Sequence, residues 1–350
     1  MPKRVAQTTL LPLVLLSLLS AFQTAFAQQP SQGQPQTDQK PDDSQEPAEK
    51  LKVNVNVVSV LFNVKDKHGA LIPNLTKDDF EIAEDGKTQT IKYFNAESNL
   101  PLTLGIMIDS SASQRNVLDM EKQVGGAFLK QILTDKDEAY VIGFDISVDL
   151  LQDFTRDVHR LQAALDKVKI GTEVATGGIP GMGGGPIPNQ NPPGTLLFDA
   201  VYLSAHDMLS KEVGRKAMIL LTDGQDEGSK LKIKDAMEAA QKADAIVYVL
   251  LCADRGSYFG SGMMYNGEFD MKKLTEATGG RVVNVGNKFD KLRDAFDQIA
   301  AELRSQYSIG YTPTNLKRDG TYRKLEIKNK QNYKIQARAG YYAGMAADNN

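Results

Sequence analysis

The chain has 350 residues, 41% apolar and 24% charged, which is the composition of an ordinary globular protein with room for about two domains. The formal net charge is −3 and no block of basic residues occurs, so the composition argues against a nucleic-acid-binding protein. Cys252 is the only cysteine, which excludes an internal disulfide and a thiolate metal cluster, and the three histidines lack the spacing of a zinc site.

Residues 1–27 have the pattern of a cleaved secretion signal. Lys3 and Arg4 form a basic start, residues 10–19 form an apolar core, and Ala25-Phe26-Ala27 supplies the small-x-small cleavage site. The apolar core is shorter than the ~20 residues that a membrane-spanning helix needs, so we expect no membrane span after cleavage. The pattern predicts an exported protein, either secreted or held in the periplasm or cell envelope.

The next segments are a linker and a β region. Residues 28–50 are rich in Gln, Pro, Asp and Ser and hold almost no large apolar side chain, so we expect a disordered linker. Residues 51–99 alternate apolar and polar side chains, with Asp85-Gly86 at the centre of a hairpin turn. This N-terminal β segment has too few strands to form a sandwich by itself.

Residues 100–306 alternate strand and helix patterns, which predicts an α/β domain. Its runs of apolar residues are typical of parallel strands buried on both faces. The link before 147–151 is too short for a crossover, so that strand is expected to pair antiparallel at an edge. We expect strands at 102–109, 138–144, 147–151, 216–221, 245–251 and 281–285, and helices at 117–133, 158–168, 196–209, 232–242, 270–278 and 289–306.

Two features complete the organisation of the chain. In residues 171–194, 13 of 24 residues are Gly or Pro, so we expect a mobile surface loop. Residues 307–343 alternate again as strands, and we expect this C-terminal β segment to pack with 51–99, leaving 344–350 as a tail; a separate C-terminal β unit is the alternative. The predicted fold is therefore a doubly wound, mostly parallel six-stranded α/β sheet with a small antiparallel β domain formed by the flanking segments.

Oxygen-bearing side chains follow two of the predicted central strands, and another lies just before a predicted helix. A D-x-S-x-S turn at the end of the first strand holds Asp109, Ser111 and Ser113. Asp223 follows the strand at 216–221. Thr195 lies where the Gly/Pro loop enters a helix. In the expected sheet order these residues converge at the carboxyl ends of the strands, where open α/β sheets bind ligands. An oxygen-only set with few charges suits a hard divalent cation and leaves a coordination position for an outside anion.

The order D-x-S-x-S, then threonine, then aspartate resembles the von Willebrand factor type A (VWA) family, over about residues 101–306. The resemblance implies a metal-ion-dependent adhesion site (MIDAS) in which Ser111, Ser113 and Thr195 bind the metal directly and Asp109 and Asp223 act largely through water. The implied cofactor is Mg²⁺, with Mn²⁺ or Ca²⁺ as alternatives, and the implied partner is a protein that offers an Asp or Glu carboxylate. The flanking β segments look like those of secreted bacterial proteins that carry this domain.

Two further predictions concern residues near this site. Asp199, four residues after Thr195, is a candidate to orient the metal ligands from behind, although a helix first-turn acid is an equal interpretation. The loop that follows the strand at 245–251 carries apolar and aromatic side chains that could form the core of an interface, or could fold back onto the domain. These partner-binding candidates are Tyr258, Phe259, Met263, Met264 and Tyr265.

The predicted function is an exported, non-enzymatic binding module of the adhesion type. One alternative is an envelope scaffold whose metal only rigidifies the loops. A Mg²⁺-dependent phosphohydrolase with Asp109 as nucleophile is a weaker alternative, because such sites need a second carboxylate at the position that Ser111 occupies. A serine hydrolase is weaker still, since the chain has no G-x-S-x-G motif.

Overall fold

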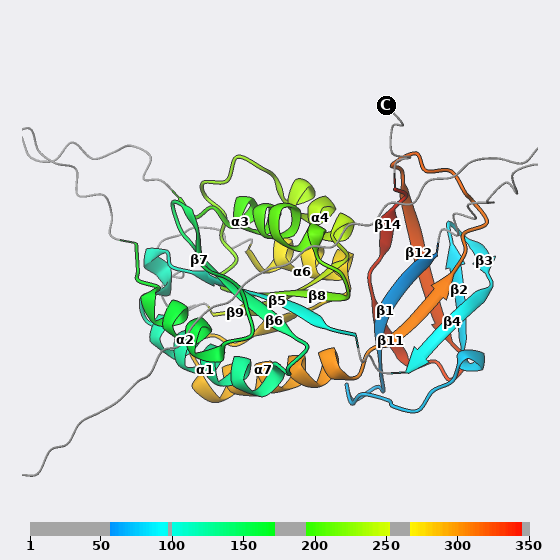
Figure 1. The fold of residues 1–350 in the computed structure, drawn as a ribbon, viewed down its shortest axis with the longest axis horizontal. Coiled ribbons are helices and arrows are strands. Elements are labelled where there is room, and N and C mark those ends of the chain that lie inside the picture. Colours follow the sequence, from blue (N-terminus) through cyan, green and yellow to red (C-terminus); the bar gives the residue numbers. More distant parts are fainter. Residues whose placement is uncertain (1–56, 97–99, 172–193, 253–266, 345–350) are drawn as a thin grey trace, which may run out of the picture. The chain divides into compact units, whose positions relative to one another are not determined.

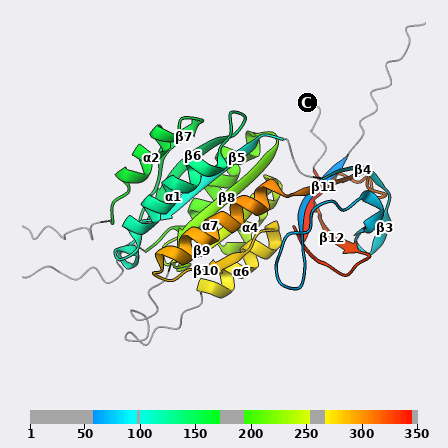
Figure 2. The same ribbon diagram turned by 90° about the horizontal axis from the view of Figure 1, so that it is seen from below.

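The computed structural model describes residues 57–96, 100–171, 194–252 and 267–344. A six-stranded sheet forms the α/β part (Figure 1), and its strands lie in the order β10-β9-β8-β5-β6-β7 (Figure 2). Neighbouring strands are parallel except β7, which pairs antiparallel with β6 at one edge, as predicted. The strands are β5 Leu102–Asp109, β6 Glu138–Phe144, β7 Val148–Thr155, β8 Arg215–Thr222, β9 Ala245–Leu251 and β10 Val282–Asn284.

Helices cover both faces of this sheet because its central strands are apolar on both faces. Every residue of β5 is buried, and Ile106 and Met107 pack into separate cores on opposite faces. Helices α1, α2 and α7 contribute to one core, and α3, α4 and α6 contribute to the other (Figures 1 and 2). The helices are α1 Leu118–Ile132, α2 Val158–Lys167, α3 Leu197–Leu203, α4 Ile233–Lys242, α6 Gly267–Thr278 and α7 Phe289–Arg304.

The predicted helix at 196–209 is interrupted in the structure. It is α-helical only over α3 and continues as a π turn, Ser204–Met208, and a 3₁₀ turn, Leu209–Lys211. The π turn begins at Ser204, whose buried hydroxyl lies 2.5 Å from the Tyr140 hydroxyl. Tyr140 in turn fills the space beside Gly105, where a Cβ would overlap its ring. The contact between distant side chains therefore accompanies a helix irregularity that the local sequence pattern does not predict.

The flanking segments interleave in two four-stranded sheets, in the orders β13-β1-β11-β4 and β14-β12-β2-β3. Pairing within these sheets is antiparallel, and each sheet contains strands from both ends of the chain. The N-terminal strands are β1 Val58–Lys65, β2 Phe80–Glu84, β3 Lys87–Gln89 and β4 Ile91–Ala96. The C-terminal strands are β11 Tyr307–Tyr311, β12 Tyr322–Asn329, β13 Lys334–Ala337 and β14 Gly340–Tyr342.

One aromatic core joins the two β sheets. Phe62 of β1, Phe80 of β2 and Tyr307 of β11 are buried together, with the Phe62 and Phe80 ring centroids 5.1 Å apart. The predicted fold class, an α/β sheet with a small antiparallel β part made by the flanking segments, is confirmed. In the described part of the chain, no helix is both long and apolar enough to cross a membrane.

Candidate functional site

The site is built where β5 and β8 end side by side. Their parallel register pairs Ile108 with Leu221, which brings Asp109 next to Thr222 at the carboxyl edge of the sheet. The buried Asp109 carboxylate accepts hydrogen bonds from the Thr222 hydroxyl (Oγ1 to Oδ2, 2.6 Å) and from the Ser111 amide (N to Oδ1, 2.9 Å). The bond from Thr222 to Asp109 joins the ends of the two strands. Thr222 also accepts a hydrogen bond from the Gly224 amide, which holds its hydroxyl in place.

The two serines of the D-x-S-x-S turn lie together beyond Asp109. A 3₁₀ turn, Ala112–Gln114, follows Ser111 and brings the Ser111 and Ser113 hydroxyl oxygens to 2.9 Å from each other. Ser113 is exposed and Ser111 is half-buried, whereas Asp109 is fully buried beneath them. The turn therefore presents two hydroxyl groups at the surface with a carboxylate behind them.

Thr195 is held against the loop that follows β8. Its carbonyl oxygen accepts hydrogen bonds from the amides of Glu227 and Gly228, at 3.2 Å each. The backbones approach so closely that a Cβ at Gly228 would overlap the carbonyl oxygen of Gly194. These contacts connect the Thr195 segment to the loop that carries Asp223, so the three predicted segments belong to one edge of the sheet.

Burial and electrostatic repulsion both raise the pKa of the Asp109 carboxyl group. Its pKa is raised to about 7, first by burial and then by the negative charge of Asp223, although hydrogen bonds from Ser111 and Thr222 lower it. Asp223 is also buried, and its Oδ1 accepts a hydrogen bond from the Gln225 amide at 3.0 Å. Two buried carboxylates that repel each other create a local demand for positive charge.

Sequence reasoning missed a third carboxylate, that of Glu121 on α1. This side chain is fully buried, and neither of its oxygens has a hydrogen-bond partner among the described residues. Burial raises its pKa to about 8, and the charges of Asp109 and Asp223 add to this effect. The nearby Cys252 thiol offsets part of it, although it forms no hydrogen bond of good geometry with the carboxyl group. The only signal in the sequence is an acid at the helical spacing of apolar residues, which does not by itself distinguish a buried acid from an exposed one.

Asp199 binds the loop before α4. Its carboxylate accepts hydrogen bonds from the amides of Lys230 (3.1 Å) and Leu231 (2.9 Å), and its own amide donates to Ser229 Oγ. Asp226 makes a parallel link, because its Oδ1 accepts hydrogen bonds from the Phe198 amide and the Ser229 hydroxyl. Both acids thus attach the start of α3 to the loop after Asp223, which positions Thr195 indirectly.

The donor set fits a hard divalent cation. Hydroxyl and carboxylate oxygens are the ligands that such ions prefer. A cation would also offset the burial of Asp109 and the repulsion from Asp223, which together raise the pKa of Asp109. Among the described residues, no group of three or more His, Cys, Asp or Glu side chains is arranged to hold a metal, so hydroxyls must supply part of any such site. The predicted partner-binding residues Tyr258, Phe259, Met263, Met264 and Tyr265, and most of the Gly/Pro loop, lie outside the described residues.

Comparisons with known proteins give weak likenesses. No family model matches the chain, and no curated protein matches it significantly. Among solved structures, it is similar to BatB from Bacteroides thetaiotaomicron, with 17% identity and a TM-score of 0.42 over 58% of this chain and 100% of that one. It is also similar to a structure of proximal thread matrix protein 1 from the mussel byssus that has a zinc-occupied MIDAS motif. The identity is 14% and the TM-score 0.43, over 61% of this chain and 48% of that one.

A von Willebrand factor type A structure from Catenulispora acidiphila is also similar, with 12% identity and a TM-score of 0.43 over 83% of this chain and 74% of that one. VWA domains are thus among the structures that this chain resembles. Because the identities and TM-scores are low, the fold assignment rests on the strand order and register, and the site rests on its own contacts.

Proposed function

We propose that this protein is a metal-dependent binding module of the adhesion type, which captures a carboxylate of a protein partner through a divalent cation at the β5–β8 edge. The observation that carries the proposal is the buried Asp109 beneath the paired hydroxyls of Ser111 and Ser113. Export to the cell envelope or beyond, as the N-terminal pattern predicts, would place the module where partners of this kind occur.

Each residue has a defined part in this proposal. Ser111, Ser113 and Thr195 would supply neutral oxygen ligands, while Asp109 and Asp223 would supply negative charge from below. Thr222 and the Ser111 amide hold the Asp109 carboxylate in one orientation. When bound, Mg²⁺, Mn²⁺ or Ca²⁺ would offer an open coordination position to an external carboxylate, because the hydroxyls that would bind it directly are neutral and leave it electrophilic.

Calorimetry with Mg²⁺ or Mn²⁺ tests the proposal directly. We expect one ion bound per chain and no measurable binding by Asp109→Ala or by the double variant Ser111→Ala with Ser113→Ala. Ser110→Ala is the matched control, since Ser110 is the neighbouring hydroxyl and donates to the Phe144 carbonyl instead of belonging to the set. Equal Mg²⁺ binding by Asp109→Ala and wild type would refute the metal site.

The binding role needs a second measurement. A partner recovered on immobilised protein from an envelope extract should be lost when a chelator is added and should not be recovered by the double serine variant. Recovery that persists with chelator, together with normal Mg²⁺ binding, would favour the scaffold alternative, in which the metal only stiffens the loops.

A further inference from the structure

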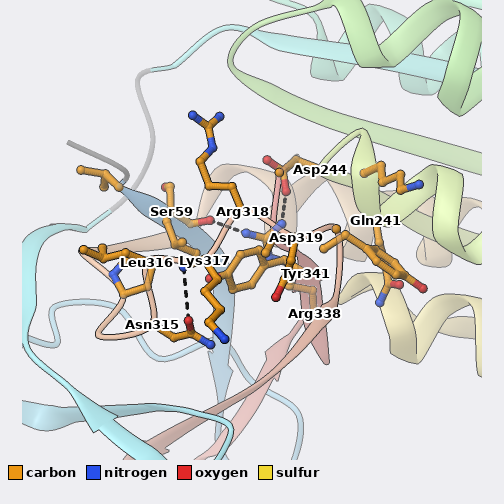
Figure 3. A pocket seen from close by; sticks show the side chains of 18 residues that line it. Ser59, Gln241, Asp244, Asn315, Leu316, Lys317, Arg318, Asp319, Arg338 and Tyr341 are labelled. Carbon is orange, nitrogen blue, oxygen red and sulfur yellow. Dashed lines mark hydrogen bonds and ion pairs between the residues drawn. The ribbon is translucent and has the colours of Figure 1, made fainter. Parts of the chain in front are cut away.

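A separate cavity of about 750 Å³ lies away from the β5–β8 edge. It is bordered by the start of β1, the connection between β11 and β12, the strand β14 and the end of α4 (Figure 3). Arg338, just after β13, is central among its labelled side chains, and exposed Leu316 and half-buried Tyr341 contribute apolar surface. Its residues take no part in the proposed metal site.

One wall of the cavity is an open strand edge. Strand β13 pairs with β1 only from Phe62 to Lys65, and the chain then turns away into β14 in the other sheet. The first half of β1, Val58–Leu61, therefore has β11 on one side and, among the described residues, no strand on the other. An unpaired edge of this kind is a template for an added strand.

The backbone of Ser59 faces this open edge. The Arg338 guanidinium donates from Nη2 to the Ser59 carbonyl oxygen at 2.7 Å, from the side that β13 occupies further along β1. In an antiparallel ladder the N–H and C=O of one residue point to the same neighbour, so the Ser59 N–H also faces the cavity. The Arg338 guanidinium thus binds the Ser59 carbonyl oxygen, to which the amide of an added strand would otherwise donate.

The cavity carries an excess of positive charge. Its acids are already engaged, because Asp244 pairs with Arg338 and Asp319 pairs with Arg323. Lys317 and Arg318, by contrast, are exposed and form no ion pair within the described part of the chain. A ligand with negative charge would therefore find free cations at this rim.

We propose that this cavity binds an extended acidic peptide segment of a partner protein, which adds to the open edge of β1 beside Ser59. Backbone hydrogen bonds to β1 would fix the register of the segment, and its carboxylates would meet Lys317 and Arg318. The segment's amide would replace the Arg338 guanidinium at the Ser59 carbonyl. This surface would give the protein a second contact with partners that is independent of a metal ion.

Fluorescence anisotropy with a labelled capped peptide, acetyl-TVDVEVT-amide, tests the proposal on the full chain in the presence of a chelator. We expect saturable binding that weakens at least tenfold for the neutral peptide TVNVQVT and at least tenfold for the double variant Lys317→Glu with Arg318→Glu. Asp109→Ala should bind the acidic peptide as wild type does, which separates this cavity from the metal site.

Ser59→Pro tests the strand edge itself. Proline removes the outward N–H without removing a bond of the β1–β11 ladder, so its thermal unfolding should match that of the control Ser59→Ala while peptide binding falls at least tenfold. No saturable binding by wild type, or equal binding by Ser59→Pro and Ser59→Ala, overturns the proposal. If Ser59→Pro does not fold, undiminished binding by the charge-reversed double variant overturns it instead.

Discussion

At the scale of single residues, the candidate site is a place where acidic side chains are buried with few hydrogen-bond partners. Asp109 receives two hydrogen bonds, but Glu121 has none among the described residues, and burial raises the pKa of both carboxyl groups. Such an arrangement costs stability in the absence of a cation, because a charged buried group loses its hydration. The hydroxyls of exposed Ser113 and half-buried Ser111 can contribute ligands at lower cost, since water still reaches them.

The burial of Glu121 predicts a pH-dependent effect of Glu121→Gln in the presence of chelator. Unfolded Glu121 titrates near pH 4.5 and the folded residue near 8, so between these values the folded state holds a proton that the unfolded state has lost. The wild-type free energy of unfolding therefore falls as the pH rises through this window, by up to about 1.4 kcal/mol per pH unit.

The glutamine variant does not lose stability in this way. The excess of its free energy of unfolding over that of wild type should therefore be absent below pH 4.5, grow up to pH 8 and stay constant above pH 8. Urea unfolding followed by circular dichroism at a series of pH values measures the difference. A difference that is the same at pH 4 and pH 8.5 would contradict the prediction.

At the scale of elements, a buried carboxylate helps to attach α7 to the β part. Glu302 on α7 is 3% exposed and pairs through Oε1 with Lys65 of β1 (2.8 Å) and with Arg281 before β10 (2.7 Å). Gln336 of β13 donates to its other oxygen at 3.2 Å, and the pKa of Lys65 is lowered chiefly by burial. The network is stable only while each of these groups keeps its partner.

We expect Glu302→Gln to lower the free energy of unfolding by about 3 kcal/mol, because it leaves the buried Lys65 without its counter-charge. Glu326→Gln is the matched control, since Glu326 pairs with Lys328 at the exposed surface, where loss of the pair should cost less than about 1 kcal/mol. Urea unfolding at neutral pH compares the two. If both substitutions lower the free energy of unfolding equally, the buried network stabilises the protein no more than an exposed ion pair does.

At the scale of the whole described chain, the flanking segments can form the β part only together. Strand β11 lies between β1 and β4, and β12 lies between β2 and β14, so each sheet needs strands from both sides of the α/β region. The shared core of Phe62, Phe80 and Tyr307 has the same requirement. Strands β1 and β11 are about 250 residues apart in the chain, so formation of this part also requires the prior closure of a long loop.

Removal of residues 307–350 should therefore unfold β1–β4 while the α/β sheet persists. We expect limited proteolysis to cut the truncated protein within 58–96, and hydrogen exchange to show rapid exchange there and slow exchange in β5 and β8. Protection of β1–β4 in the truncated protein would contradict the shared core.

The sequence by itself determined the alternation of strands and helices, the antiparallel edge strand and the order of the motifs at the strand ends. These features depend on local periodicity and on link lengths, so residues 102–109 and 216–221 were recognisable as buried strands. The joining of the two flanking segments was also predictable, because neither had enough strands to close a core.

Only the tertiary structure decided which side chains meet. The bond between Thr222 and Asp109 depends on the register of β5 against β8, and the burial of Glu121 depends on how α1 packs on the sheet. The open edge of β1 arises because β13 leaves the sheet after Ala337, which no local pattern encodes. The physical reason is common to all three: contacts between residues far apart in the chain depend on packing and register, whereas sequence periodicity reports only the faces of each element.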